Sequence, residues 1–566
     1  MNLKTEKKSL AIIILFVLFV ASVVGNIILA NMITPTTTYN TLVRGTGAGP
    51  HTIDPVNCWD SASSDVILQV CEGLFGYDLS DLNLSRVPRL ATGYWWKDTT
   101  HLQVTLRQGV MFHDGAIFNS TSAKWNFNRI MYLTNSTGTL PITSPLAEAV
   151  SLYFFNITYN DNGIMNGGTP IIKSVTAVGA WNLSIVLNAA FAPFLDLLCF
   201  EASLMVSPKS TPADRFLHLD EKLVGTGPFT FDSFTPNVAV RFSRWEHYWR
   251  PVPGFQKMVF SIIQDPVTLN NAMLEGQLDL ISVINLFIID QYEANPDILV
   301  RHITDDTDIP GLSYYYLGFN NRLVNSTWRK AISYAINYTY IIDQMAYGLV
   351  VRANSPISPG WGNRCNMSVK AADYNLTHAR QVLINAGVTN LAIDDDVGWK
   401  NANLLSLNYT YNHDNTFRSD LFYLLTEWLD KLGIEVIDYS GPGSFEPFSS
   451  LWQPNWNYVG IFWVGWGPDY LDPFNMLDPL FNPLSASNVA YVNDTWLNTQ
   501  MALALKTTND DSRNAIYKNI QWFLANSLYP HAFGYYPKIV GVQAADLHGV
   551  SFNAFGKFEA YGIWRA

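Results

Sequence analysis

The segment of residues 461–481, IFWVGWGPDYLDPFNMLDPLF, places a carboxylate among several aromatic rings. Its first part has the apolar and aromatic residues of a buried strand, which Gly467 and Pro468 then end in a stiff turn. Asp469 follows this turn and is flanked by Trp463, Trp466 and Tyr470. A carboxylate among aromatic faces suits a ligand with a cationic head and an apolar body. The alternative is a turn aspartate that only accepts a hydrogen bond from a nearby backbone amide.

The sequence lacks the common motifs of nucleophilic, metal-dependent and nucleotide-binding enzymes. It has no GxSxG, HExxH or P-loop motif, and the glycine-rich patch at 45–49 is followed by Pro50 and not by a helix. Two His-Asp pairs fit turns or surface positions better than metal ligation: His113-Asp114 and His413-Asp414. We therefore expect no catalytic residues, no metal and no cofactor.

Composition limits the class of protein. A chain of 566 residues is long enough for two or three domains, and 48% hydrophobic residues indicate a folded protein. The formal net charge of −12 argues against nucleic acid or an anionic membrane surface as a partner. The four cysteines, Cys58, Cys71, Cys199 and Cys365, do not have zinc-site spacing. Cys58 and Cys71 could form a disulfide in an oxidising exterior, and buried or free thiols are the alternative.

The N-terminal segment predicts a membrane anchor. Residues 10–30 contain no charge, and 21 residues at about 1.5 Å each span a bilayer as a helix. Lysines precede this segment, so the positive-inside rule places the rest of the chain outside the cell. A cleaved signal peptide is the alternative for residues 1–31, and residues 32–41 read as a Thr-rich tether. An exterior location also agrees with N-glycosylation sequons, which begin at Asn83, Asn119, Asn135, Asn156, Asn182, Asn325, Asn337, Asn366, Asn375, Asn408 and Asn493.

From Thr52 onward, short strands alternate with helices, which indicates an α/β protein. The clearest helix follows a predicted strand at 314–319. Its apolar residues between Trp328 and Ile336 recur at helical spacing, and Thr327 is the predicted N-cap. We expect this stripe to pack on a core and not on a ligand. Other predicted helices cover residues 61–74, 121–133, 421–432 and 511–527.

Several segments follow one another in a recognisable order. They are Ile53-Asp54-Pro55, CEGLFGYD, VTLRQGVMFHDGAIFNSTSAKWNFNRI, LVGTGPFTFDSF with Tyr248-Trp249, LGFNNRLVNSTWRKAISYAINYTYIID, and WVGWGPDYLDPFNMLDPLF. In these segments, their order and their rough spacing, the chain resembles the extracytoplasmic solute-binding proteins of ABC transporters, family 5. The resemblance is to the dipeptide- and oligopeptide-binding branch, and it covers most of residues 42–566.

The resemblance implies an α/β, two-lobed periplasmic-binding-protein-like fold (type II, the large peptide-binding class) whose lobes close on a ligand. It implies no enzymatic activity. In peptide binders, the Asp at the position of Asp469 pairs with the peptide α-ammonium, and Trp466 matches the aromatic residue that precedes it. The chain differs from the oligopeptide binders just before this segment, where it has Trp463 and no basic residue. The resemblance therefore indicates neither a partner for a peptide carboxylate nor a peptide length.

The resemblance also divides the chain. It implies a first lobe of residues 42–300 and 534–566, with an inserted subdomain near 76–204, and a second lobe of residues 301–533. The N-terminal transmembrane helix would precede the first lobe. The predicted anchor and the sequons together are typical of an archaeal protein.

These observations predict the substrate-binding component of an ABC importer, which captures di- or oligopeptides outside the cell and delivers them to permease subunits in the membrane. We expect a monomer that does not bind nucleic acid. The predicted ligand-binding residues are Asp469, Trp466, Trp463, Tyr470, Tyr315 and Trp361. Because the chain is rich in aromatic residues, an oligosaccharide binder of the same family is an alternative. A glycosylated cell-surface structural protein and a secreted hydrolase are further interpretations.

Overall fold

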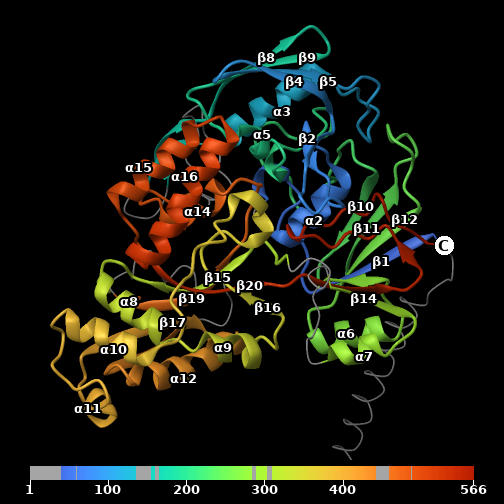
Figure 1. Cartoon of the computed structure of the whole chain (residues 1–566). Helices are drawn as coiled ribbons and strands as arrows, with labels where there is room; N and C mark the ends of the chain where they lie inside the picture. The colour runs from blue at the N-terminus through green and yellow to red at the C-terminus, as the bar shows by residue number, and fades with distance from the viewer. Residues whose placement is uncertain are drawn as a thin grey trace, which may run out of the picture.

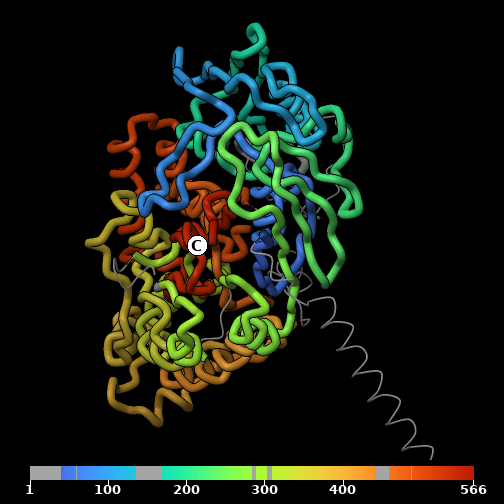
Figure 2. Tube along the Cα trace, turned by 90° about the vertical axis from the view of Figure 1, so that its right-hand side faces the viewer, coloured from blue at the N-terminus to red at the C-terminus, as the bar shows by residue number. Residues whose placement is uncertain are grey.

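The computed structural model describes residues 40–58, 60–134, 154–159, 165–282, 288–302, 309–441, 458–485 and 487–565. Three sheets of four or more strands, with their helices, form the body of the protein (Figure 1). Seen from the side, the four-stranded sheet and the helices around residues 376–430 occupy opposite ends of the molecule (Figure 2).

A seven-stranded sheet joins the two ends of the described chain. Its strands, in order, are β10 (Phe229–Thr235), β11 (Ala239–Arg244), β12 (Lys257–Ile262), β1 (Thr41–Thr46), β13 (Leu280–Ile281), β21 (Val540–Ala544) and β14 (Ile298–His302). Strand β1 pairs in parallel with β12 and β13, whereas β21 is antiparallel to β13 and β14. The chain therefore returns to its first sheet near its C-terminus. Helices α2 (Ser61–Val70), α6 (Pro266–Leu274) and α7 (Ile289–Glu293) accompany this sheet.

A six-stranded sheet carries the segment singled out by the sequence. Its strands, in order, are β16 (Val350–Arg352), β20 (His531–Pro537), β15 (Tyr314–Phe319), β19 (Ile461–Trp466), β17 (Leu405–Asn412) and β18 (Ile434–Gly441). Its helices are α8 (Ser326–Ala335), α9 (Tyr338–Tyr340), α10 (Leu376–Asn385), α11 (Asp396–Asn401) and α12 (Thr416–Asp430). Strand β20 runs past residue 533 and β14 past residue 300, so both expected lobe boundaries fall inside strands.

A four-stranded sheet lies at the top of Figure 1 and consists of β4 (Ala91–Asp98), β5 (His101–Leu106), β9 (Asn182–Leu187) and β8 (Ile172–Val178). Helix α3 (Ser120–Leu133) packs on it, and α5 (Phe194–Leu197) follows β9. Helices α14 (Phe474–Phe481), α15 (Thr495–Lys506) and α16 (Asp510–Phe523) share one hydrophobic core with this region. For example, the rings of Phe191 and Phe474 meet edge to face at 6.3 Å.

Smaller elements complete the described chain. They are the strand pairs β2 (Phe75–Tyr77) with β3 (Arg86–Pro88), β6 (Phe154–Tyr159) with β7 (Met165–Pro170), and β22 (Leu547–His548) with β23 (Trp564–Arg565), and the short helices η1 (Pro55–Asn57), η2 (Glu201–Ser203), η4 (Ile341–Met345), η5 (Pro359–Arg364) and η6 (Leu524–Leu528).

The apolar stripe of helix α8 lies in the core, as predicted. Trp328, Ile332 and Ile336 belong to the hydrophobic cluster beneath the six-stranded sheet. The predicted N-cap was wrong by two residues, because Asn325 and not Thr327 accepts the backbone N–H, here from Trp328 at 3.1 Å. Helix α2 ends at Val70, four residues before the predicted end.

Two predictions concern the N-terminus and the cysteines. The predicted anchor and nearly all of the tether lie outside the described residues, and β1 already begins at Thr41, the last residue assigned to the tether. Of the helices that the structure describes, none combines the length and hydropathy needed to cross a bilayer. All four cysteines are buried free thiols, so Cys58 and Cys71 form no disulfide here.

Candidate functional site

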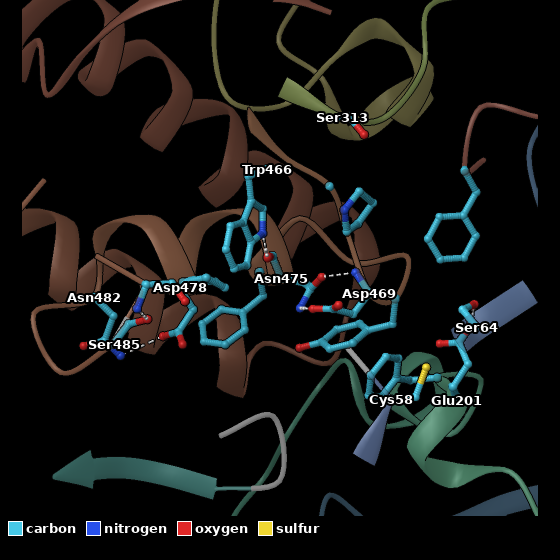
Figure 3. Close-up of a pocket in the computed structure, with 18 of the residues that line it drawn as sticks. Cys58, Ser64, Glu201, Ser313, Trp466, Asp469, Asn475, Asp478, Asn482 and Ser485 are labelled. Carbon is cyan, nitrogen blue, oxygen red and sulfur yellow. Dashed lines mark hydrogen bonds between the residues drawn. The ribbon is translucent and has the colours of Figure 1, made fainter. Parts of the chain in front are cut away.

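A cavity of about 590 Å³ opens beside the turn that follows β19. Its walls come from segments far apart in the sequence. They are the start of α2, the residues around Glu201, the turn and helix of residues 465–485 with Ser487, helix α15, and the loop of residues 555–557. Figure 3 labels residues of the first three of these segments. The cavity therefore lies where the chain's first sheet region, the β19 turn and the C-terminal loop meet.

Asp469 borders this cavity and is held in place by Asn475 of α14. The Asp469 backbone N–H donates to Asn475 Oδ1 at 2.5 Å, and Asn475 Nδ2 donates to Asp469 Oδ2 at 3.0 Å. Asn475 is only 1% exposed, so this clamp is rigid. The half-buried carboxylate is thus oriented by the side chain six residues after it, as Figure 3 shows.

Two of the predicted aromatic residues also line the cavity. Trp466 is half-buried, and its indole Nε1 donates to the backbone carbonyl of Asn475 at 3.2 Å. Tyr470 is buried against the wall, and burial raises the pKa of its hydroxyl well above the usual range. Asp469, Trp466 and Tyr470 therefore lie on one wall, where Asn475 is hydrogen-bonded to the first two.

The other three predicted residues, Trp463, Tyr315 and Trp361, do not line the cavity. Trp463 is 2% exposed and packs against Phe417 and Tyr535, with ring centroids 5.6 and 5.7 Å away. Tyr315 stacks on Tyr535 at 4.9 Å, and Trp361 is buried in the core shared with α14. The physical reason for Trp463 is the strand period: side chains three residues apart, such as 463 and 466, point to opposite faces of β19.

The lining also carries an ion pair, close to Asp469, that the sequence analysis did not identify. Lys557 Nζ lies 2.6 Å from Glu201 Oε1 and 2.9 Å from Ser64 Oγ, and Ser64 Oγ donates to the same carboxylate oxygen at 2.5 Å. Burial lowers the pKa of Lys557, but its interactions with the Glu201 carboxylate, Cys58 and Asp469 together outweigh this effect and raise the pKa. The lysine is therefore charged and already has an anionic partner.

Two further groups in the cavity wall were also missed. Asp478 of α14 accepts a hydrogen bond from Asn482 Nδ2 at 2.7 Å. Burial raises the pKa of this carboxyl to about 6, although the hydrogen bond acts in the opposite direction. Cys58 lies near Glu201, and burial raises the pKa of its thiol well above the usual range, with the Glu201 charge adding to the effect. Cys58 is thus a protonated, unreactive thiol, whereas Asp478 titrates close to neutral pH.

The sequence model of the family of bacterial extracellular solute-binding proteins, family 5 (middle region), matches residues 85–488. This match spans most of the chain and includes the β19 turn. The chain belongs to this family. Its members bind solutes for ABC importers, so the cavity beside Asp469 is the candidate solute site of a family 5 protein.

Related proteins and structures agree with this family. The heme-binding protein A of Haemophilus influenzae is 25% identical over 81% of this chain and 80% of its own length. The glutathione-binding protein GsiB of Salmonella typhi is 25% identical over 85% of this chain and 86% of its own. The periplasmic binding protein DppA of Helicobacter pylori, solved in complex with the peptide STSA, superposes with a TM-score of 0.74 at 21% identity, over 93% of this chain and 98% of that one. This superposition supports the two-lobed periplasmic-binding-protein-like fold.

Proposed function

We propose that this family 5 solute-binding protein captures peptides outside the cell, binds their α-ammonium group at Asp469, and delivers them to the permease of an ABC importer. The observation that carries this proposal is the clamped Asp469 carboxylate at the wall of a cavity of about 590 Å³. A cavity of this size suits a short peptide, since small-ligand sites have volumes of about 300–1,000 Å³.

The wall around Asp469 supports an ammonium partner. Trp466 and Tyr470 present apolar surface beside the carboxylate, and this surface lowers the local dielectric and excludes water. The Asn475 amide donates to one oxygen of the Asp469 carboxylate, so the carboxylate has the same orientation with and without a ligand. An ion pair formed in such a site is strong because hydrogen bonds satisfy its remaining lone pairs.

The variant Asp469→Asn tests this proposal, because it keeps the shape of the side chain and removes its charge. Losing one partner of a buried charge pair costs about 2 to 5 kcal/mol, or roughly 30- to 5,000-fold in affinity. We expect calorimetry to show this loss for free-amine peptides, and we expect N-acetylated peptides to bind poorly to the native protein. Asp420→Asn, on the exposed side of α12, is the matched control for removing one negative charge. Equal affinity of the native protein for free and acetylated peptides would rule out the ammonium site.

An oligosaccharide is the second candidate ligand, and the composition of the cavity wall favours it. Aromatic residues, among them Trp466, lie beside amide and hydroxyl groups such as those of Asn482 and Ser485. Aromatic faces stack on sugar rings, and these polar groups bind sugar hydroxyls. For a sugar, Asp469→Asn should cost only about 1 kcal/mol, the value of a neutral hydrogen bond. The size of the effect therefore separates the two ligands.

The proposal also covers the cellular location of the protein and the division of the chain into two lobes. The family is extracytoplasmic, which supports a body outside the cell. We propose that residues 9–31 anchor this body in the membrane, on the evidence of the uncharged segment and the lysines before it. The seven-stranded sheet would form the core of the first lobe and the six-stranded sheet that of the second. Glycosylation of the sequons and archaeal character stay predictions.

A further inference from the structure

The charges around the cavity are strongly unequal. Five carboxylates line it, Asp60, Asp65, Glu201, Asp469 and Asp478, and Lys557 is the one basic residue in the lining that the structure describes. Lys557 is already paired with Glu201 and also interacts with the Asp469 charge, and Arg44 lies 2.7 Å from Asp65. Within the described parts of the chain, no cation lies at ion-pair distance from Asp60 or Asp478. The wall therefore carries a surplus of negative charge.

The unsatisfied polar atoms of the wall point to the same kind of ligand. Three buried side-chain atoms in the lining have no hydrogen-bond partner in the described structure: Asp60 Oδ2, Glu201 Oε2 and Asn498 Oδ1. All three are acceptors, and Glu201 is only 2% exposed. Burial of an acceptor without a donor costs free energy, which a ligand recovers where binding brings its donors into contact with these atoms. Ammonium and guanidinium groups consist of donors only.

The cavity offers little to a ligand carboxylate. Besides Lys557, its described lining contains no Lys, Arg or His, and the sequences of the internal segments that the structure does not describe contain none either. A carboxylate that entered this space would meet charges of the same sign, and contacts between like charges oppose binding. The carboxyl end of a peptide is therefore either neutral or directed out of the cavity.

Asp469 and Asp478 lie on one wall, because Asn475 and Asp478 are three residues apart on α14 and share a face of that helix. Figure 3 shows Asp469 on one side of Asn475 and Asp478 on the other. We propose that the preferred solute is a cationic peptide, whose α-ammonium pairs with Asp469 while an arginine or lysine side chain pairs with Asp478. This inference rests on the proposed function and defines the class of peptide that the site selects.

Peptide pairs that differ only in arginine or citrulline test the inference, because citrulline has nearly the same shape and no charge. Calorimetry on the full-length native protein should give about 10- to 100-fold tighter binding of the arginine peptide, the value of a charge-assisted hydrogen bond. In Asp478→Asn the two peptides should bind with similar affinity. The control Asp420→Asn, whose side chain is exposed on α12, should keep the full preference.

Proton release gives a second readout that a structural role of Asp478 would not produce. Because the pKa of this carboxyl is about 6 in the free protein, a bound guanidinium lowers it and releases protons near pH 6. The arginine peptide should therefore show a binding enthalpy that depends on the buffer at pH 6. The citrulline peptide and Asp478→Asn should show a much weaker dependence. Thermal denaturation of Asp478→Asn establishes that the variant is folded.

The outcomes separate the inference from the proposed function. If arginine and citrulline peptides bind the native protein equally, and both require Asp469, the cationic selection is wrong and the peptide function stands. If the arginine preference persists in Asp478→Asn, the assignment of Asp478 is wrong. If neither free-amine peptide binds, the peptide function fails and the inference fails with it.

Discussion

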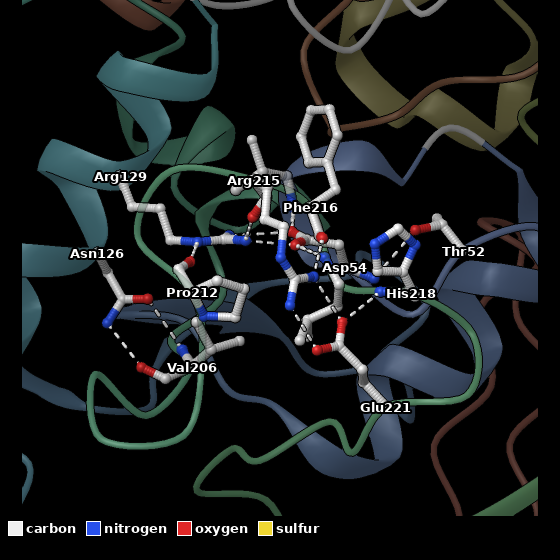
Figure 4. Close-up of polar contacts among 12 residues, drawn as sticks. Thr52, Asp54, Asn126, Arg129, Val206, Pro212, Arg215, Phe216, His218 and Glu221 are labelled. Carbon is white, nitrogen blue, oxygen red and sulfur yellow. Dashed lines mark hydrogen bonds and ion pairs between the residues drawn. The ribbon is translucent and has the colours of Figure 1, made fainter.

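The ion pair of Asp54 and Arg129 allows a quantitative test of how the first sheet region is held together. The two side chains are 0% and 1% exposed, and Arg129 donates through both terminal nitrogens to the Asp54 carboxylate (Figure 4). Arg129 also donates to the carbonyl oxygens of Pro212 and Arg215, at 2.7 and 2.9 Å. Asp54 in turn accepts the backbone N–H groups of Val56 and Leu217, at 3.0 and 2.8 Å. The pair thus ties helix α3 to η1 and to the loop around residues 212–217.

Replacement of Arg129 by methionine keeps much of the side-chain volume and removes its donors. The buried Asp54 carboxylate then loses its cation, and two backbone carbonyls lose a donor. Breaking a buried pair in this way costs about 3 to 5 kcal/mol. A lobe of about 290 residues unfolds with an entropy of about 0.6 kcal/mol/K, so we expect calorimetry to show a Tm lower by about 5 to 8 °C.

Arg215→Met is the matched control, because Arg215 pairs with Glu221 at the surface and its side chain is 46% exposed. We expect a much smaller change in Tm for this variant, since solvent screens such pairs. The double variant Asp54→Asn, Arg129→Met should lose less stability than the sum of its single variants, because no buried charge is left without a partner. A Tm for Arg129→Met that matches that of Arg215→Met would refute this reasoning.

Three further predictions concern the core, the cavity and the N-terminus. Ile332→Ala should lower the free energy of unfolding by about 2 to 5 kcal/mol through a cavity, with nearly unchanged ligand affinity of the folded fraction; loss of binding in a stable variant would contradict the core assignment. Because the folded pKa of Asp478 is about 6, above its usual value, the free energy of unfolding should fall as pH rises from about 4 to 6. Asp478→Asn should flatten that part of the pH profile in denaturant titrations. Protease treatment of intact cells should remove the body of the protein if residues 9–31 anchor it, whereas a mature chain that begins near residue 31 would indicate a cleaved signal peptide.

Local sequence signals were sufficient to find one wall of the cavity. Gly467 and Pro468 end a buried strand, and Asp469 follows directly. The sequence therefore predicts this carboxylate at a strand end, which is where the structure places it. The choice among the neighbouring tryptophans was less successful. Both Trp463 and Trp466 lie on β19, and their side chains point to opposite faces. Which face belongs to the cavity depends on α12, whose Phe417 covers Trp463.

The part of the wall around Lys557 and Glu201 could not be predicted, because it depends on contacts between segments that are distant in the sequence. Lys557 meets Glu201 across 356 residues and Ser64 across 493 residues. None of these residues lies in a motif, and a single lysine or glutamate in a sequence has no pattern that marks it as buried. Asn475 and Asp478 lie in the segment of residues 461–481 that the sequence analysis singled out, but no pattern there marked them as residues of the cavity wall.

The sequons illustrate how one short pattern has two physical origins. Asn119, Asn325, Asn337 and Asn375 all stand at N-caps, where their side chains accept backbone N–H groups of the following helix. Asparagine is favoured at this position, and in all four helices a Thr stands two residues later, in the first turn. A helix start therefore generates N-x-Ser/Thr without any glycan. At Asn408 the amide nitrogen that would carry a glycan donates to the Tyr458 carbonyl at 2.7 Å.

The sequence motifs shared with the family mainly stabilise the fold. Asp54 and Arg129 come from two of the matched segments and pair with each other in the core. Glu72 of CEGLFGYD accepts hydrogen bonds from three residues of two later segments, at 2.8 to 3.0 Å: Tyr248, Trp249 and Thr226.

Of the matched segments, only the last reaches the described lining of the cavity. The rest of the wall, including Lys557, Glu201 and Asn498, lies outside all of them. The relatives are named for heme and glutathione, and a structural neighbour holds a peptide, so family membership alone does not name the solute of this chain. For this chain, the acidic residues of the cavity wall, including Asp469 and Asp478 of the last segment, therefore indicate the solute better than the motifs that pack in the core.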